Sequence, residues 1–244
     1  VAEKGDDRVI CGVCARLHFS DCRVREAATE ALTWIAHKGD VRIITAMTSQ
    51  LEDQEAHIRE LAAEQLCEVA EKGDERVITA VSARLKHWNG GVRRAAVVAL
   101  SRISQKGDER VIATLIEQLG DWDEGVRQSV GTALSCVAVM GDERVITTVS
   151  ACLRDLDWRV REAALETLSI CTKKGDGRVV ASVVILLQDP QAHIRKQASD
   201  TLSDIAEKGE ERVVAAVSAL LKDRDGSVRV AAIKALSKIA KQGD

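Results

Sequence analysis

The sequence contains very few of the residues around which a single globular core is usually built. Its 244 residues include no tyrosine, one phenylalanine (Phe19) and one proline (Pro190), and aromatic residues make up only 2% of the chain. This argues against one core assembled around Phe and Tyr. Ala, Val, Leu, Glu, Lys and Arg are abundant instead, and together with the scarcity of proline they predict mostly helix with short turns marked by glycine.

The chain also lacks a strong excess of one charge and any long apolar run. A formal net charge of −3 does not favour nucleic acid as a partner. The longest apolar run, Val179 to Leu187, is interrupted by Ser182 and is too short to span a bilayer, so no transmembrane segment is expected. Seven cysteines, an odd number in a chain that needs no disulfides, predict a reducing intracellular compartment, the cytoplasm or an organelle stroma.

One period runs through the whole sequence. Glycine recurs every 34 residues from Gly5 to Gly243, and no insertion or deletion interrupts the spacing. Arginine keeps the same period in two series, one beginning at Arg8 and one at Arg25, and leucine does so from Leu17 and from Leu32. Regular self-similarity of this length is typical of proteins built from stacked supersecondary units.

Each period divides into two predicted helices, as the third copy shows. Its first helix is expected over 74–85, where Val77, Ile78, Val81 and Leu85 form one apolar stripe, and its second helix over 89–105. Both begin with residues suited to N-capping. Aspartates open the first helices from Asp6 to Asp176, and Asp or Asn opens most second helices. The periodic glycine is expected to be the left-handed residue that ends each second helix.

Two helices cannot bury these stripes alone, whereas stacked neighbours can. The sequence therefore predicts an all-α solenoid with one continuous core, in which small residues such as Ala62 and Ala96 let helices approach closely. We expect a single array of seven hairpins over residues 1–244. The predicted repeats are 5–38, 39–72, 73–106, 107–140, 141–174, 175–208 and 209–242, with 1–4 and 243–244 as parts of flanking repeats.

The second helices share the pattern Asp-x-x-Val-Arg-x-Ala-Ala-x-x-Ala-Leu, seen at 21–32, 157–168 and 225–236 with close variants elsewhere. It resembles the HEAT repeats, particularly the short HEAT-like repeats of phycobilisome lyases, and the resemblance covers all seven units. It implies an armadillo-like, right-handed α-solenoid with the second helices on the concave face. It also implies ladders between repeats that pair the Asp of the turn with the Arg of the second helix, as Asp157 with arginines such as Arg161.

Positions that differ between copies are the candidates for binding. On the second helices, the positions equivalent to 26, 30, 34 and 37 share one face. They are acidic in copy two, from Glu60 to Glu71, acidic again in copy six, and basic in copy seven at Lys234, Lys238 and Lys241. The central copies place Val98, Arg102, Thr132, Cys136 and Ile170 there. An apolar or mixed centre within charged surroundings is typical of an interaction groove, and equally compatible with a solvated face that drifted after duplication.

The turn between the two helices offers a second candidate. Trp88 and Trp122 occupy the same position in neighbouring copies, Leu156 follows in the next, and Trp158 lies two residues further on. Equivalent positions in stacked repeats are neighbours, so these side chains are expected to form a row suited to binding a partner. The alternative is that each ring folds back over its own turn. The first helices also lose polar residues towards the C-terminus, as at Val184 and Ile185, which predicts a more apolar outer surface.

No catalytic constellation is found. Cys11, Cys14, His18 and Cys22 approach the spacing of a zinc site, but the equivalents of the first three in other copies need no metal. No His-Glu dipeptide of the iron-binding HEAT-like hydroxylases occurs. We therefore expect no enzyme, metal or cofactor, but a scaffold or adaptor that binds protein partners as part of a larger complex. The alternative is a lyase-like or pigment-carrying protein with a ligand around Val98, Cys136 and Ile170.

Overall fold

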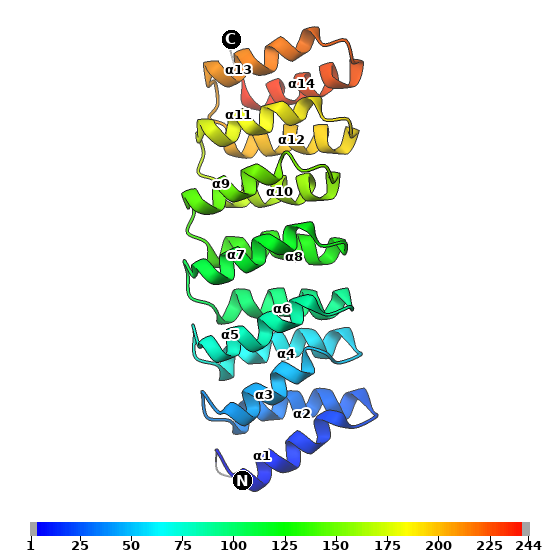
Figure 1. Ribbon diagram of the computed structural model, residues 1–244, viewed down its shortest axis with the longest axis vertical. Helices are drawn as coiled ribbons and strands as arrows, with labels where there is room; N and C mark the ends of the chain where they lie inside the picture. Colours follow the sequence, from blue (N-terminus) through cyan, green and yellow to red (C-terminus); the bar gives the residue numbers. More distant parts are fainter. Residues whose placement is uncertain (1–3, 241–244) are drawn as a thin grey trace. The chain divides into compact units, whose positions relative to one another are not determined.

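The structure, a computed structural model, describes residues 4–240. All regular secondary structure in that range is helical, with fourteen α-helices, five short 3₁₀ helices and no strand (Figure 1). The chain forms two compact units, Val1–Gln118 and Leu119–Asp244. Residues 1–3 and 241–244 lie outside the described residues, and with them most of the expected flanking segments and Lys241 of the basic stripe.

The first unit holds three complete hairpins and the first helix of a fourth. Its helices are α1 (Asp7–Cys14), η1 (Ala15–His18), α2 (Cys22–Ile35), α3 (Val41–Gln50), α4 (Ala56–Val69), α5 (Glu75–Ser82), η2 (Ala83–Lys86), α6 (Gly90–Ile103) and α7 (Glu109–Glu117). A 3₁₀ helix, η3 (Gln118–Gly120), falls at the boundary between the units.

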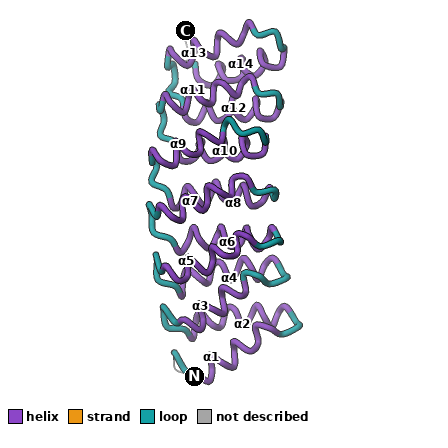
Figure 2. The backbone as a smooth tube through the Cα atoms, viewed as in Figure 1, coloured by secondary structure: helices purple, strands orange, loops and turns teal. Residues whose placement is uncertain are grey.

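The second unit continues the same order of elements. Its helices are α8 (Glu124–Val137), α9 (Glu143–Cys152), α10 (Trp158–Cys171), α11 (Gly177–Ile185), η4 (Leu186–Gln188), α12 (Ala192–Ile205), α13 (Glu211–Ala219), η5 (Leu220–Lys222) and α14 (Gly226–Ile239). Odd-numbered α-helices are the first helices of the hairpins and even-numbered ones are the second. Loops join them at both ends of the hairpins (Figure 2).

The helix starts follow the capping residues in the sequence. Asp74 accepts a hydrogen bond from the backbone N–H of Arg76 at 2.9 Å, and Asn89 accepts one from Gly91 at 2.8 Å. Capping of this kind satisfies donors that have no partner inside the helix. The first helices are shorter than expected, because several of them tighten into a 3₁₀ turn before the loop; α5 gives way to η2 at Ala83.

The core of each unit lies along its second helices. In the first unit α2, α4 and α6 pack closely on one another, and in the second α8, α10, α12 and α14 do the same, whereas neighbouring first helices touch far less. Ala62 and Ala96 are fully buried between them, as their small size suggests. The first helices lie beside this layer in each unit and pack less closely on one another (Figure 1).

From the sequence we expected each periodic glycine to end the second helix before it. The structure shows that it does not. Gly39 does have a positive φ of 84°, but α2 already ends at Ile35 and Gly39 lies in the connecting loop. Its N–H donates to the carbonyl of Val69, the last residue of α4 in its own repeat, 39–72, at 2.7 Å. Gly5 binds Ile35 in the same way, and Gly175 binds Ile205. Each glycine thus binds the end of the second helix of its own repeat, and so ties the start of a hairpin to its end.

Candidate partner-binding surfaces

An arginine of the second helix, buried in most copies, binds the backbone of each inter-helix turn. Arg25 on α2 donates from Nη1 to the carbonyls of Phe19 and Ser20 at 2.9 and 3.0 Å. Arg93 does the same for His87 and Trp88 at 2.7 and 3.0 Å. With its carbonyls turned inwards to the guanidinium, the turn has a fixed backbone. Its side chains are therefore presented in one orientation.

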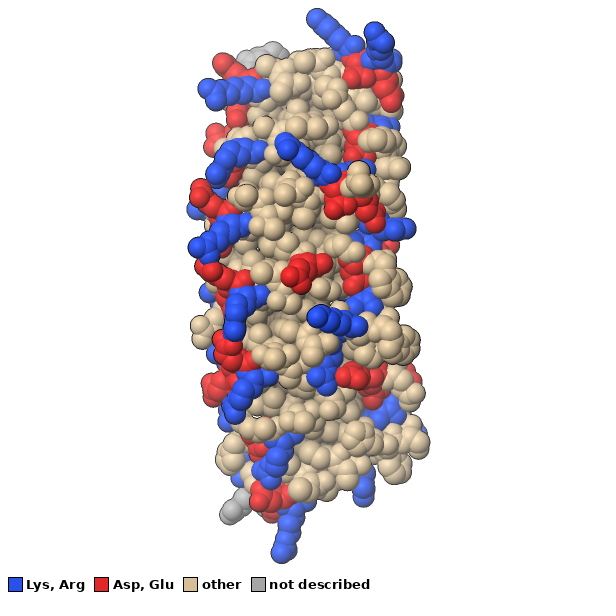
Figure 3. Space-filling model, viewed as in Figure 1, with Lys and Arg blue, Asp and Glu red and all other residues tan. Residues whose placement is uncertain are grey.

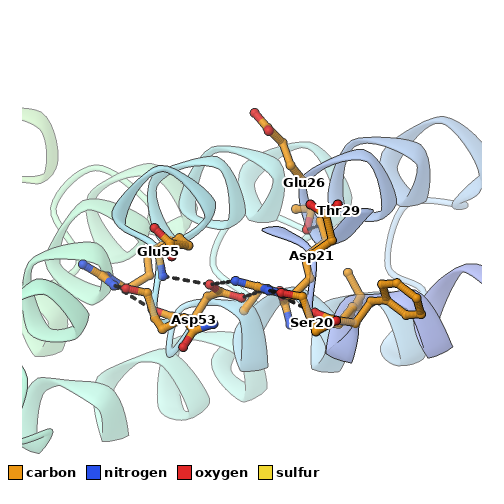
Figure 4. A network of polar contacts seen from close by, with 12 residues as sticks. Ser20, Asp21, Glu26, Thr29, Asp53 and Glu55 are labelled. Atoms are coloured by element: carbon orange, nitrogen blue, oxygen red, sulfur yellow. Dashed lines mark hydrogen bonds and ion pairs between the residues drawn. The ribbon is translucent and has the colours of Figure 1, made fainter. Parts of the chain in front are cut away.

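The same arginine ties one repeat to the next. Arg25 donates from Nε and Nη2 to both carboxylate oxygens of Asp53, at 2.7 and 3.0 Å, with both side chains almost fully buried (Figure 4). These bonds raise the pKa of Arg25. Arg161 makes the corresponding pair with Asp189 at 2.7 and 3.1 Å. A bidentate pair of this kind is strong and directional.

The ladder exists, but its acid is not the one expected. Asp157 is the N-cap of α10 and accepts the backbone N–H of Arg159 at 2.9 Å, whereas Arg161 pairs with Asp189 of the following turn. The acidic partner lies two residues before the N-cap position, where the carboxylate can reach back to the preceding repeat. In the repeat that follows Arg59, the position two residues before the N-cap holds His87 instead of an aspartate. The described bonds of Arg59 are those to the carbonyls of Asp53 and Gln54. The ladder therefore has gaps set by sequence.

The turn position singled out in the sequence is solvent-exposed in both units. Trp88 in the first unit is 80% exposed, and Trp122 and Leu156 in the second are 71% and 100% exposed. Trp88 makes a tilted contact with the neighbouring His87 ring at 5.4 Å. This exposure shows that the rings do not fold back over their turns, whose backbone is held from behind by arginine bonds to the carbonyls of Trp88 at 3.0 Å and Trp122 at 3.3 Å.

Trp158 is placed differently from these residues. It is the first residue of α10, and it is half-buried. Its ring makes an edge-on contact with the imidazole of His193 at 4.6 Å, and the guanidinium of Arg159 lies 5.3 Å from its centroid. Because Trp158 contacts a residue of the next repeat, it contributes to the packing of α10 beside α12 as well as to the surface.

The acidic face of copy two lies on α4 and on the loop that follows it. Glu60, Glu64, Glu68 and Glu71 are exposed. Two of them are paired with the next repeat, Glu60 with Arg94 at 2.8 Å and Glu64 with Arg102 at 3.2 Å. Arg102, a candidate binding residue, is therefore held against the acidic stripe. Exposed pairs of this kind add little stability and can be exchanged for a partner's charges.

The candidate central residues fall in both units. Val98 is half-buried and Arg102 exposed in the first unit, and Cys136 and Ile170 are exposed in the second, Ile170 by 43%. The second unit brings the Cys136 thiol near Cys171, whose pKa is raised to about 11, by burial first and by Cys136 second. Val98 lies in the first unit and Cys136 in the second, and each unit is described by itself. The ligand site suggested around these residues therefore stays a prediction.

Two features of these faces were missed in the sequence. Glu166 lies on the same face of α10 as Ile170, is half-buried, and has a raised pKa because of burial and the neighbouring Glu162, so this stretch is not simply apolar. Trp34, at the equivalent position in copy one, is 80% exposed beside Glu30 and Glu68. The signal in the sequence is that Trp34 occupies the variable second-helix position equivalent to Arg102 and Ile170.

The possible zinc residues are dispersed over two helices and a turn. Cys11 and Cys14 lie on α1, His18 ends η1, and Cys22 begins α2. Within residues 4–240 no group of three or more His, Cys, Asp or Glu side chains is placed to hold a metal ion. All seven cysteines are free thiols. None of the helices in this range is both long and apolar enough to cross a membrane.

Comparison with known proteins adds the family. The family described as HEAT repeats matches residues 44–135, and that described as HEAT repeat associated with sister chromatid cohesion matches residues 138–168. No curated protein matches the chain. A crystal structure of an engineered protein, a target of the Northeast Structural Genomics Consortium, is 16% identical over 95% of this chain and 96% of that one, with a TM-score of 0.44, too low to support an inference. The two family matches and the stacked helical hairpins show that this chain belongs to the HEAT-repeat proteins, whose all-helical solenoid scaffolds are suited to protein interaction.

Proposed function

We propose that this chain is a non-catalytic scaffold or adaptor that binds protein partners through its repeat surfaces, as one array of seven hairpins. The observation that carries the proposal is the exposure of Trp88 and Trp122 at the same turn position. Tryptophan is among the residues that contribute most to protein interfaces. Exposing two at equivalent places serves no purpose in folding.

The turn geometry supports the same conclusion. Because Arg93 and Arg127 fix the backbone behind Trp88 and Trp122, these turns lose little conformational freedom on binding. A tryptophan side chain of about 200 Å² could contribute roughly 5 kcal/mol by burial at about 25 cal/mol per Å². Two such anchors would contribute roughly 10 kcal/mol, which is comparable to the about 4–15 kcal/mol that association costs, so the contacts around them complete the interface.

The remaining candidates extend the proposed surface. Trp158 would add to the turn edge, and Val98, Arg102, Cys136 and Ile170 would form a second, mixed face on the second helices. Arg102 could exchange Glu64 for a partner's carboxylate. Seven free cysteines support a reducing intracellular compartment as the place where the scaffold works.

The test compares proteins retained by the wild-type chain and by the double variant W88A/W122A, identified by mass spectrometry after affinity isolation from the source cells. Trp34→Ala is the matched control, because Trp34 is as exposed as Trp88 but lies on a second helix. Partners lost from the double variant and kept by the control are expected, with unchanged helical circular dichroism. Identical sets on all three proteins would remove the turn edge from the proposal.

A further inference from the structure

The N-terminal ends of the first helices are joined by an ion-pair series distinct from the buried ladder. Arg42 on α3 reaches Asp7 on α1 at 2.7 Å, and Arg178 on α11 reaches Glu143 on α9 at 3.2 Å. Arg110 on α7 pairs with Glu75 on α5. In each case the first residue of a first helix provides the carboxylate, and the first helix of the next repeat provides the arginine. These side chains span the gap between neighbouring first helices.

Two junctions cannot form this bridge, because the acidic position holds another residue. The residue at this position is Val41 on α3 and Gly177 on α11, and the two are four repeat lengths apart. The structure has a groove at both places, one between α3 and α5 and one between α11 and α13. Charged side chains lie mainly along the edges of the face in Figure 3 and leave the first helices largely uncharged between them. The missing acid therefore coincides with an accessible apolar groove.

The groove between α11 and α13 has an aliphatic floor and a basic rim. Val180, Val184 and Val213 line its floor together with Ala181 and Ala216. Lys173, Lys174, Arg178 and Arg212 lie around its mouth. The two carboxylates there, Asp176 and Glu210, are at the N-cap positions of α11 and α13, where the helix N-terminus offsets their charge. A side chain added at Gly177 would meet no atom within 4 Å, so the mouth of the groove is open space.

Arg212 differs from four other arginines of its series. Arg42, Arg76 and Arg178 each pair with the N-cap aspartate of their own helix, and Arg110 pairs with Glu75. Arg212 has no ion pair with any residue of the range 4–240: its own N-cap is Glu210, and Gly177 brings no carboxylate from the preceding repeat. In the α3/α5 groove, by contrast, Arg76 and Arg84 are occupied by Asp74 and Glu52.

We infer that the groove between α11 and α13 binds an acidic segment of a partner protein. A carboxylate of that segment pairs with Arg212 as Glu143 pairs with Arg178. An aliphatic side chain next to that carboxylate lies on Val180, Val184 and Val213, and the two lysines attract further acidic residues. The inference rests on the proposed scaffold function and names a partner chemistry and a surface for it. That surface is separate from the tryptophan turns.

The test introduces at the groove the acidic residue that other repeats carry at this position. Gly177→Glu restores the missing acid, which should pair with Arg212 as Glu143 pairs with Arg178. A phage library of random dodecapeptides is selected on the full chain, and the enriched peptides are measured against variants by fluorescence polarisation. We expect acid-rich peptides with aliphatic residues, whose affinity falls at least about tenfold in G177E and in R212Q. Val41→Glu, the same change at the α3/α5 groove, should leave their affinity unchanged.

Three results would overturn the inference. The enriched peptides could bind G177E as well as the wild type, or the groove-dependent ones could be neutral or basic. A wild-type chain that dimerises in sedimentation while G177E stays monomeric would assign the groove to a second copy instead. Peptides lost in W88A/W122A but kept in G177E would support the proposed function and still reject this groove. Circular dichroism of each variant confirms that the fold is retained.

Discussion

Replacing Asp189 with alanine is expected to destabilise the second unit by about 3–5 kcal/mol, the usual cost of removing one partner from a buried ion pair. The guanidinium of Arg161 would keep its bonds to the carbonyls of Asp155 and Leu156 but lose both bonds to the carboxylate, at 2.7 and 3.1 Å. The two side chains are only 11% and 3% exposed, so water could not replace the lost acceptors at once.

Asp155 provides a matched control at the equivalent position one repeat earlier. Both aspartates accept a backbone N–H within their own turn at 2.8 Å, Asp155 from Asp157 and Asp189 from Gln191. Asp155 is exposed and forms none of the described ion pairs. Asp155→Ala should therefore cost only about 1 kcal/mol, the value of one such hydrogen bond. The difference between the two variants, about 2–4 kcal/mol, isolates the ion pair.

Hydrogen exchange is the suitable assay, because stability in a stacked array is a sum of local terms and unfolding need not be two-state. Protection should fall in peptides from α10 and α12 of D189A and remain close to the wild-type value in D155A. Urea unfolding followed by circular dichroism gives the global comparison. Equal losses in the two variants, within about 0.5 kcal/mol, would show that the ladder contributes no more than its turn hydrogen bond.

Two further predictions concern a carboxylate and two glycines. Burial and Glu162 raise the pKa of Glu166, so the folded chain favours its neutral form; this contribution is complete below the unfolded pKa of about 4.3 and is lost as the pH rises through the folded pKa. Glu166→Gln should therefore raise the Tm at pH 7 and not at pH 4, and an equal rise at both would contradict the assignment. Gly39→Ala should cost about 1–2 kcal/mol because φ is +84° although nothing obstructs a Cβ, whereas Gly177→Ala, at an ordinary φ, should stabilise by about 0.4–1 kcal/mol. Thermal denaturation distinguishes them, and changes of the same sign would refute the backbone argument.

Much of the local structure followed from the sequence because short-range chemistry determines it. Asp74 and Asn89 predicted the helix starts correctly, since an N-cap side chain acts over two or three residues. The apolar stripe of 74–85 predicted the buried positions Val77, Ile78 and Val81. For Trp88 the sequence left two placements open, and only the tertiary structure, in which its side chain is 80% exposed, distinguishes them.

The sequence by itself determined that the chain is a helical repeat protein, because a 34-residue period with two apolar stripes can be buried only by stacking. Tertiary structure decided what each invariant residue does. Gly39 binds the second helix of its own repeat rather than the helix before it, and Arg161 pairs with Asp189 rather than Asp157. Both contacts join residues about one repeat apart, and a periodic sequence offers several equivalent partners at that distance. Only the packing of the helices, within a hairpin and between hairpins, selects among them.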